Sequence, residues 1–298
     1  MKKRTATILV ILMIITGLSL LLYPTVSDYL KTLAYRRTIS DYISNVEPMD
    51  DRRSAELLDA ARAYNEQLVS RGGFRVSLPE AQREEYYSLL NIDNTGIIGY
   101  VSVPKVDISL PLYHGTEERV LQSGVGHLEG SSLPVGGPST HAVLSTHTGL
   151  PSAKLFTNID QLVAGDTFSV RVLKETLTYE VDQILVVLPH ETDALKIEPG
   201  KDYCTLMTCT PYGVNSHRLL VRGHRVPTIA GEDASSNLVE KFLGLNNGRL
   251  FGLNAELGFL LLFVLLTAAV VSVMLLRRRK RTKRPEQQEK AGETPPEP

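Results

Sequence analysis

The chain has 298 residues, of which 43% are hydrophobic and 22% are charged, so it can bury a core as one large domain or two modest ones. The formal net charge at pH 7 is -1, which argues against general nucleic-acid binding. The chain holds two cysteines and no tryptophan. Its apolar residues gather in two long runs, one near each end.

The first apolar run covers residues 5–27, carries no charge and follows Lys2, Lys3 and Arg4. It is long enough to cross a bilayer as a helix, and its basic flank predicts a cytoplasmic N-terminus. A cleaved signal peptide would have the same basic start. No small-x-small cleavage site follows the run, so we favour an uncleaved anchor.

The second apolar run covers residues 257–276 and is followed at once by a basic stretch, residues 277–284. This flank predicts that the C-terminus also lies inside, so that two crossings leave residues 28–256 outside the cell. A cell-wall sorting tail is the alternative, but residues 244–256 contain no Leu-Pro-x-Thr-Gly. Residues 285–298 are rich in Glu, Gln and Pro and are predicted to be disordered.

The outer segment begins with helical patterns. Apolar residues recur at helical spacing over residues 28–43, and Pro48 breaks the pattern. A second helix is predicted over residues 50–69, ended by two glycines. Residues 74–94 have mixed polarity and are predicted to be loop with some helix.

From residue 95 on, short β-rich runs alternate with turn residues. Roughly seven or eight short strands, with one short helix near residues 117–122, predict an all-β barrel or sandwich. The runs are residues 97–104, 108–113, 141–146, 167–172, 176–188, 202–210 and 217–226.

Cys204 and Cys209 are the two cysteines, and a disulfide is the usual expectation for cysteines outside the cell. In a strand, however, five residues span about 16 Å, and an odd spacing points two side chains to opposite faces. The geometry therefore opposes a disulfide. Cys204 fits a small buried apolar side chain, whereas Cys209 lies at a strand end that can be open to a substrate.

Residues 211–215 read Pro-Tyr-Gly-Val-Asn, a composition typical of a turn between two strands. Folding the chain there brings Cys209 beside Arg218, because cross-strand neighbours have Cβ atoms about 5 Å apart. A guanidinium beside a thiol favours the thiolate or holds an oxyanion. A solvated charge at a strand edge is the alternative for Arg218, and composition alone favours that alternative.

A nucleophilic cysteine needs a proton-transfer partner, most often a histidine. His147 follows the predicted strand over residues 141–146 and precedes Thr148 and Gly149, so it can reach across a cleft. By spacing alone it ranks only slightly above His217. The histidine and cysteine spacings lack a compact ligand set, so neither a metal nor another cofactor is expected.

These residues resemble a known family. Residues 205–210, Thr-Leu-Met-Thr-Cys-Thr, look like the TLxTC signature of sortases, and His147 and Arg218 match that family's histidine and arginine in the expected order. The likeness is strong over residues 96–228. The helices, both apolar runs and the residues 63–65 and 126–134 are similar to the pilin-polymerising class C branch.

The resemblance implies a mainly β fold, a sortase-type eight-stranded β-barrel with N-terminal helices and a transmembrane helix at each end. It implies a cell-membrane protein with two crossings, an extracellular catalytic domain and contacts with membrane lipid. The expected parts are a cytoplasmic N-terminus and anchor (1–27), a helical layer with a lid-like region (28–95), the catalytic barrel (96–228), a linker (229–256), a transmembrane helix (257–276) and a basic cytoplasmic tail (277–298).

The resemblance also implies a reaction. Cys209 would attack the Thr carbonyl of a Leu-Pro-x-Thr-Gly-like signal on a pilin or surface protein, giving a thioester. His147 would transfer protons and Arg218 would stabilise the oxyanion or position the signal. Thr208 and Thr210 are substrate-binding candidates. In class C enzymes the incoming amine is a lysine of another pilin subunit, so the product is a pilus polymer.

One departure from the class C pattern concerns the lid. Class C sortases usually carry an Asp-Pro-aromatic motif before the barrel that plugs the active site. Residues 74–80 read Phe-Arg-Val-Ser-Leu-Pro-Glu and lack this motif. We expect weaker autoinhibition than in relatives with the motif.

Three other functions compete with pilus assembly. The chain could be a housekeeping-type sortase that joins surface proteins to a peptidoglycan amine. It could be a catalytically silent scaffold that binds sorting signals, or a thiol protease that hydrolyses them. Feeding a lysine amine or a peptidoglycan amine to the acyl-enzyme separates pilus assembly from the housekeeping function.

Overall fold

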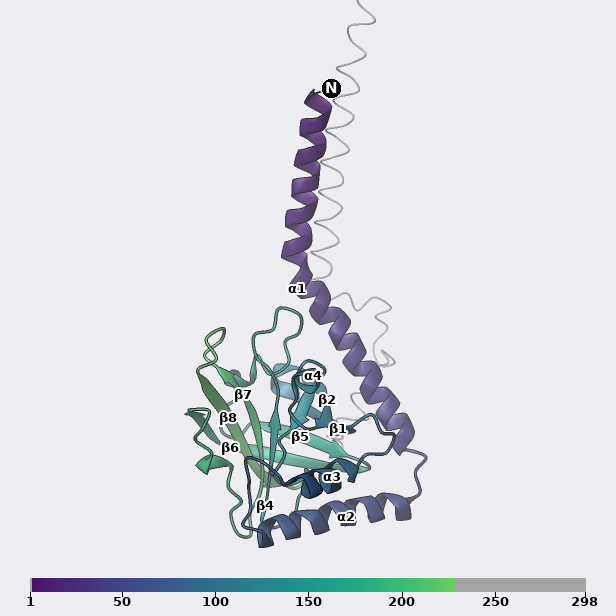
Figure 1. Cartoon of the computed structure of the whole chain (residues 1–298), viewed down its shortest axis with the longest axis vertical. Helices are drawn as coiled ribbons and strands as arrows, with labels where there is room; N and C mark the ends of the chain where they lie inside the picture. The colour runs from purple at the N-terminus through teal and green to yellow at the C-terminus, as the bar shows by residue number, and fades with distance from the viewer. Residues whose placement is uncertain (1, 229–298) are drawn as a thin grey trace, which may run out of the picture. The chain divides into compact units, whose positions relative to one another are not determined.

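The computed structural model describes residues 2–228, and side chains from residue 9 on. The predicted linker, the second apolar run over residues 257–276 and the basic tail lie outside the described residues. The described residues form a closed β-barrel with helices along its side and across one end (Figure 1).

Helix α1, Lys2–Val46, joins two predicted segments into one. Its segment Leu9–Val46 contains a stretch that is long and apolar enough to cross a membrane by length and composition. Pro24 lies inside the helix, which bends on its way past the barrel (Figure 1). The sequence predicted an anchor followed by a separate helix from residue 28. The structure shows no break there because the apolar run passes directly into the helical spacing of the next segment.

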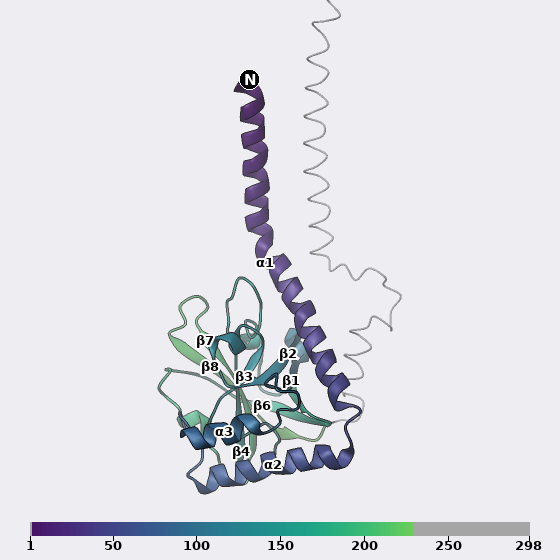
Figure 2. The same cartoon turned by 45° about the vertical axis from the view of Figure 1, so that its right-hand side comes forward.

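Helix α2, Asp51–Ser70, begins where predicted, and the side chain of Asp50 accepts a hydrogen bond from the backbone N–H of Arg52. One side of α2 is buried against the barrel. Its Asn65 donates to the carbonyl of Leu133 at 3.0 Å and accepts from the N–H of the same residue at 2.7 Å. Figure 2 shows α2 across the end of the barrel farthest from the N-terminal half of α1. Helix α3, Glu80–Ser88, follows in the segment predicted as loop with some helix.

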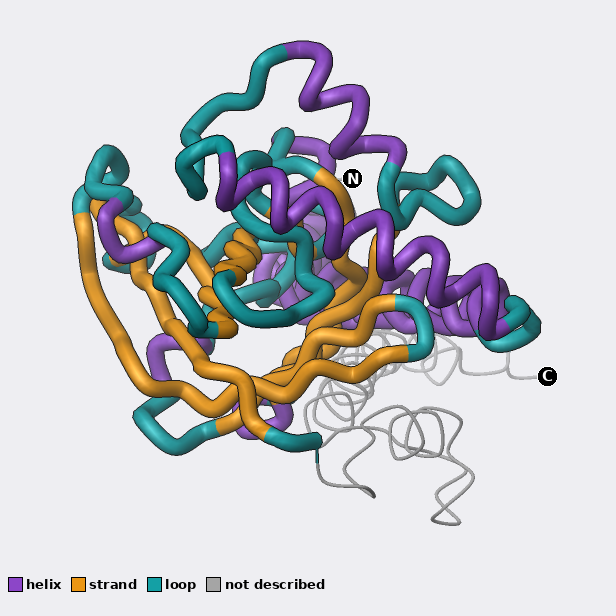
Figure 3. The backbone as a smooth tube through the Cα atoms, turned by 90° about the horizontal axis from the view of Figure 1, so that it is seen from below, coloured by secondary structure: helices purple, strands orange, loops and turns teal. Residues whose placement is uncertain are grey.

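The strand order around the barrel is β1-β2-β3-β4-β7-β8-β6-β5. Most neighbours are antiparallel, but β2 with β3 and β4 with β7 are parallel. Figure 3 shows the strands curving around the barrel, with helices on one side. The strands are β1 Ile97–Val103, β2 Ile108–His114, β3 Val125–His127, β4 Thr140–Ser145, β5 Thr167–Val172, β6 Glu175–Val187, β7 Asp202–Thr210 and β8 His217–Val226, with a short helix α4, Glu118–Leu121.

The eight-stranded barrel confirms the predicted fold class for the described residues. Each run predicted as a strand is a strand, but the sequence missed β3. This strand has three residues, one of them a glycine, and is paired in parallel with β2, so it has no hydrophobic alternation long enough to recognise.

Side chains alternate between the two faces of each barrel strand. On β4 and β7, Leu144, Cys204 and Leu206 belong to the main core inside the barrel. Val143 and Met207 belong to a second, smaller apolar cluster on the outside. This alternation decides which residues can meet at the functional site.

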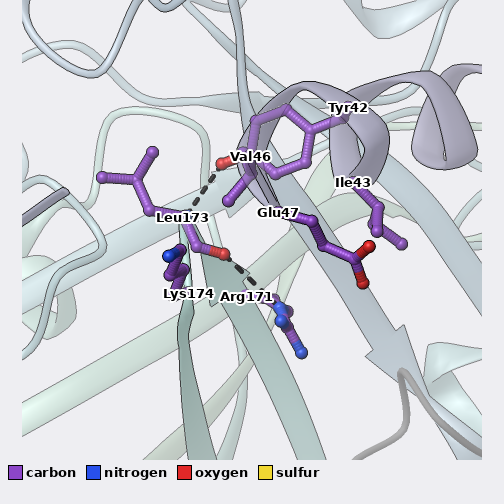
Figure 4. Close-up of a pocket in the computed structure, with 7 residues that line it drawn as sticks. All are labelled: Tyr42, Ile43, Val46, Glu47, Arg171, Leu173 and Lys174. Carbon is purple, nitrogen blue, oxygen red and sulfur yellow. Dashed lines mark hydrogen bonds between the residues drawn. The ribbon is translucent and has the colours of Figure 1, made fainter. Parts of the chain in front are cut away.

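Tyr42, near the end of α1, fastens the helix to the barrel. Its hydroxyl donates to the carbonyl of Ile98 at 3.0 Å and accepts from the N–H of Leu173 at 2.8 Å. A hollow of about 170 Å³ lies here, lined by residues of α1 and of the β5–β6 turn (Figure 4). Lys174 bridges to the carbonyl of Met49 and the carboxylate of Asp51. This hollow contains no nucleophile and marks a structural junction between helices and barrel.

Two buried histidines lie around Tyr86 of α3. The Tyr86 hydroxyl is 2.8 Å from Nδ1 of His127 and accepts from the N–H of Gly115, and its ring packs edge-on against His114. Burial lowers the pKa of His127 to about 4, and burial followed by the nearby His127 lowers that of His114 to about 3. Both rings are therefore neutral in the folded protein at neutral pH.

We expect the protein to lose stability as the pH falls from about 6.5 toward about 4. An unfolded histidine takes up a proton in this range while His114 and His127 stay neutral, so each lowers the free energy of unfolding by up to about 1.4 kcal/mol per pH unit. Denaturant unfolding of the detergent-solubilised chain should show this slope. His114→Phe should reduce the slope, and His190→Gln, at an exposed position, should not. Equal slopes in the unmodified chain and both variants would contradict a role for buried His114.

Candidate active site

Cys209 and Arg218 face each other across two antiparallel strands. The ladder of β7 and β8 pairs Met207 with Leu220 and Cys209 with Arg218. The prediction that a turn over residues 211–215 places Cys209 beside Arg218 on the next strand is confirmed by this pairing. The turn is shaped by Gly213 and Asn215, which have positive φ values of 75° and 60°.

The parallel partner of β7 on its other side is β4, and it leads to His147. The ladder pairs Ser145 with Met207. Beyond the last pair, the N–H of Thr146 donates to the carbonyl of Met207 at 3.3 Å. Thr208 extends the contact, because its hydroxyl donates to the carbonyl of Thr146 at 2.8 Å. Continuing this register by one more residue places His147 beside Cys209.

The alternation of side chains gives the three predicted residues a common face. Met207 lies on the outer face, so Cys209, two residues on, points the same way. Arg218 follows as the cross-strand partner of Cys209. His147 follows from the register of β4. Cys209 and Arg218 thus share the outer face of β7 and β8, and extending the alternation of β4 two residues past its end, Ser145, puts His147 on the same side.

The two cysteines lie in opposite environments, as predicted. Both are free thiols. Cys204 is fully buried in the main core, and burial raises the pKa of its thiol well above the usual value. Cys209 is partly exposed. Only Cys209 therefore has the access that a nucleophile needs.

A hollow of about 200 Å³ opens beside Cys209. Its walls come from the β4–β5 loop and from the two strands that meet at the β7–β8 turn. Thr208 and Thr210, the two substrate-binding candidates, both line it, although the buried hydroxyl of Thr208 is committed to Thr146. The other lining residues are Thr148, Phe156, Thr157, Asn158, Asp160, Gln161, Tyr212 and Leu219.

Tyr212 connects the β7–β8 turn to the loop that follows His147. Its ring lies so close to Gly149 that a Cβ there would be 2.9 Å from the ring. Gly149 also has a φ of +74°, which favours glycine. Any larger residue at this position would push the tyrosine away from the hollow.

Arg218 is held in place by its own turn. Its Nη1 donates to the carbonyl of His217 at 3.1 Å and to that of Asn215 at 3.3 Å. Both of these bonds use Nη1, and the backbone ladder places Arg218 opposite Cys209. A fixed cation with spare donors is suited to holding a developing oxyanion.

A carboxylate lies beside His147. Glu118 Oε1 is 3.3 Å from Nε2 of His147 and accepts from the side-chain amide of Gln122 at 2.6 Å. The bond from Gln122, followed by the nearby His147, lowers the pKa of Glu118. The carboxylate is therefore ionised at neutral pH. The sequence gives no signal for this contact, because it depends on where His147 lies in the fold.

The other histidines are less suitable. His141 is buried, with Nδ1 2.9 Å from the carbonyl of Lys196 and Nε2 2.7 Å from the hydroxyl of Thr205. His217 lies opposite Thr210 in the ladder, one residue from Arg218 and so on the other strand face, with Nδ1 2.9 Å from the hydroxyl of Ser216. His147 is the better candidate because it shares a face with Cys209.

An apolar strip continues along the same outer face away from Cys209. Met207 and Leu220 lie in it, covered in part by Phe74 from the segment before α3. Among the described residues that line the hollow at Cys209, none comes from residues 70–90, the lid-like region. The segment is nonetheless integrated into the fold, since Tyr86 and Leu90 are fully buried.

Among residues 2–228, no group of three His, Cys, Asp or Glu side chains is arranged to hold a metal ion. The chemistry available at this site is that of a thiol, an imidazole with a carboxylate neighbour and a guanidinium. This set suits acyl transfer through a covalent intermediate.

Known proteins of similar sequence and structure share this arrangement of strands. The sortase domain profile matches residues 101–226. The crystal structure of sortase C1 from Streptococcus agalactiae is 54% identical, covers 64% of this chain and 99% of its own, and superposes with a TM-score of 0.63. The structure of Streptococcus pneumoniae sortase C, described in terms of catalysis and pilin substrate specificity, is 43% identical. It covers 65% of this chain and 98% of its own, and superposes with a TM-score of 0.59.

Among curated proteins, sortase A of Streptococcus agalactiae is 27% identical over 152 residues, which are 50% of this chain and 61% of that protein. The chain thus matches less than two thirds of that relative's length. The structural relatives, in contrast, are covered almost completely. The chain belongs to the sortase family of cysteine transpeptidases, and its structural neighbours are class C sortases.

We expect one thiol to react in the folded protein. Cys209 is partly exposed and Cys204 is fully buried with a raised pKa, so a thiol reagent should label Cys209 and spare Cys204. Intact mass after labelling should show one adduct in the folded chain and two after unfolding in denaturant. Labelling should vanish in folded Cys209→Ala and persist in Cys204→Ala; two rapid adducts in the folded chain would contradict the assigned burial.

We expect Thr208 to position the site rather than bind substrate with its hydroxyl. Thr208→Val removes the bond to the carbonyl of Thr146, next to His147, and should slow reaction of Cys209 with substrate by roughly tenfold, the equivalent of about 1.4 kcal/mol. Thr208→Ser keeps a donor and should stay close to the unmodified rate. Single-turnover rates measure this, and an unchanged rate in Thr208→Val would disprove the positioning role.

Proposed function

We propose that Cys209, His147 and Arg218 are the catalytic residues of a transpeptidase that cleaves Leu-Pro-x-Thr-Gly-like sorting signals between Thr and Gly. Two observations support the proposal: β7 and β8 pair Cys209 with Arg218, and the register of β4 against β7, continued past Ser145, leads to His147. The alternative set with His217 loses the common face of Cys209 and Arg218.

The proposed reaction has two acyl transfers. The sulfur of Cys209 attacks the Thr carbonyl carbon, and the tetrahedral oxyanion is stabilised by the guanidinium of Arg218. The C–N bond to Gly breaks as His147 gives a proton to the leaving amine, which leaves a thioester on Cys209. An incoming amine then attacks the thioester, His147 takes its proton, and the thiolate leaves.

The partners follow from the family. Sortases act on surface proteins with sorting signals, and class C sortases act on pilins. We assign the acceptor as a lysine amine of a pilin subunit, so that the product is an isopeptide-linked pilus. The class C identity of the structural neighbours supports this choice over a peptidoglycan amine.

The proposed location is the cell membrane, with the barrel outside. The apolar stretch of α1 supports the first crossing. The second crossing, over residues 257–276, rests on the sequence. Weaker autoinhibition than in class C relatives stays a hypothesis, supported by the absence of residues 70–90 from the lining of the hollow. Deleting those residues would be a poor test, because the deletion removes buried Tyr86 and Leu90.

Covalent capture tests the reaction class. The full chain in detergent, mixed with a Leu-Pro-x-Thr-Gly peptide, should gain the mass of the acyl fragment on Cys209. Cys209→Ala should abolish the adduct and Cys204→Ala should retain it, because Cys204 is closed off in the core. Arg218→Ala should reduce adduct formation about 100-fold or more, the scale for losing one oxyanion donor. A chain that binds the peptide without any adduct would be a silent scaffold.

The acceptor is identified by feeding amines to the captured thioester. A pilin segment with its lysine should release the acyl group as an isopeptide faster than a peptidoglycan-like amine does. Preference for the peptidoglycan amine would make the chain a housekeeping-type sortase. Release to water at the same rate with and without amines would indicate a thiol protease.

A further inference from the structure

The membrane-proximal part of α1 touches the catalytic end of the barrel. Ser27 donates from its hydroxyl to the carbonyl of Ser152 at 3.1 Å. The next residue, Asp28, accepts from the backbone N–H of Lys154 at 2.8 Å, and its carboxylate is 3.8 Å from the ammonium group of that lysine. Ser152 and Lys154 belong to the β4–β5 loop, which begins at Thr146, contains His147 and lines the hollow at Cys209.

The direction of α1 relative to the barrel follows from its two attachments. Residues 27–28 contact the catalytic end, and Tyr42 is bonded beside Ile98 and the β5–β6 turn. The apolar half of the helix therefore leaves the barrel from its catalytic end. Figures 1 and 2 both show the N-terminal half of α1 projecting past the end that carries the β4–β5 loop and the β7–β8 turn.

The level of the membrane surface is set by charge. Asp28 is the first charged residue after Arg4, so an apolar run that crosses a bilayer ends just before Asp28. The β4–β5 loop, which contacts Ser27 and Asp28, then lies at the membrane–water boundary. An α-helix rises 1.5 Å per residue, so there is no room for a long spacer between the bilayer and this loop.

The β7–β8 turn lies at the same level and is apolar at its tip. The ring of Tyr212 packs on Gly149 in the β4–β5 loop, three residues before Ser152. Tyr212 is 67% exposed and Val214 is 69% exposed. Tyrosine with an aliphatic neighbour is typical of segments that rest among lipid headgroups, where an aromatic ring has one apolar and one wet side.

We propose that Tyr212 and Val214 of the β7–β8 turn rest in the interfacial layer of the bilayer that α1 crosses, so that Cys209 opens onto the membrane surface. This inference rests on the proposed anchoring by α1. These contacts favour a lipid surface as the partner of the turn, because the covalently attached helix holds this end of the barrel against a bilayer at all times. A peptide bound at the hollow would cover Tyr212 but not necessarily Val214, which does not line it.

Tryptophan scanning tests the contact, because the chain has no tryptophan of its own. Three full-length variants, Val214→Trp, Leu20→Trp and Val76→Trp, are reconstituted in phosphatidylcholine vesicles with or without brominated acyl chains. Leu20 lies in the apolar half of α1. Val76 is the matched control: it is 74% exposed, as open as Val214, and belongs to the segment that joins α2 to α3.

Brominated vesicles should reduce the tryptophan emission of Leu20→Trp and Val214→Trp and leave that of Val76→Trp unchanged. The emission maximum of Val214→Trp should also lie at a shorter wavelength than that of Val76→Trp. Quenching of Leu20→Trp alone would overturn the proposed contact while leaving the anchor intact. If Leu20→Trp is not quenched, the anchoring itself fails and the contact falls with it. A Val214→Trp signal that responds to a sorting-signal peptide but not to brominated lipid would assign the turn to substrate instead.

Discussion

The site depends on the position of β7 between β4 and β8. Parallel pairing with β4 on one side and antiparallel pairing with β8 on the other fix Cys209 against both neighbours. Because side chains alternate strictly along a strand, a slip of one residue in either ladder would turn Cys209 or one of its partners to the other face. Leu144, Leu206 and Val221 are buried in the barrel core and oppose such a slip. Hydrophobic packing inside the barrel therefore keeps Cys209 and Arg218 on the outer face.

The sequence predicted what local pattern and short-range geometry can carry. Three features could be recognised because each depends on residues that are close in the chain. They are the strands with clear alternation, the turn after Thr210 and the pairing of Cys209 with Arg218. The proximity of His147 needs a parallel pairing between strands far apart in the chain, which no local pattern specifies. Spacing alone ranks His147 only slightly above His217; the family resemblance favours it, and the register of β4 supports that choice.

Other features of the site could not be read from the sequence because they depend on tertiary contacts. The short strand β3 forms by pairing with β2. The contact of Glu118 depends on the position of His147, and the need for glycine at position 149 depends on the ring of Tyr212. The continuity of α1 was missed for a different reason. The change in composition at Asp28 looks like a boundary, but a helix can pass through a change of environment without a break.

The burial of Cys204 has a consequence for oxidation. The two thiols belong to one strand but lie on opposite faces of it, one in the core and one outside. A sulfenic acid formed on Cys209 therefore has no thiol within the chain with which to condense, since the chain has two cysteines in all. Its repair would fall to an external reductant, and without one the next oxidation steps would be irreversible.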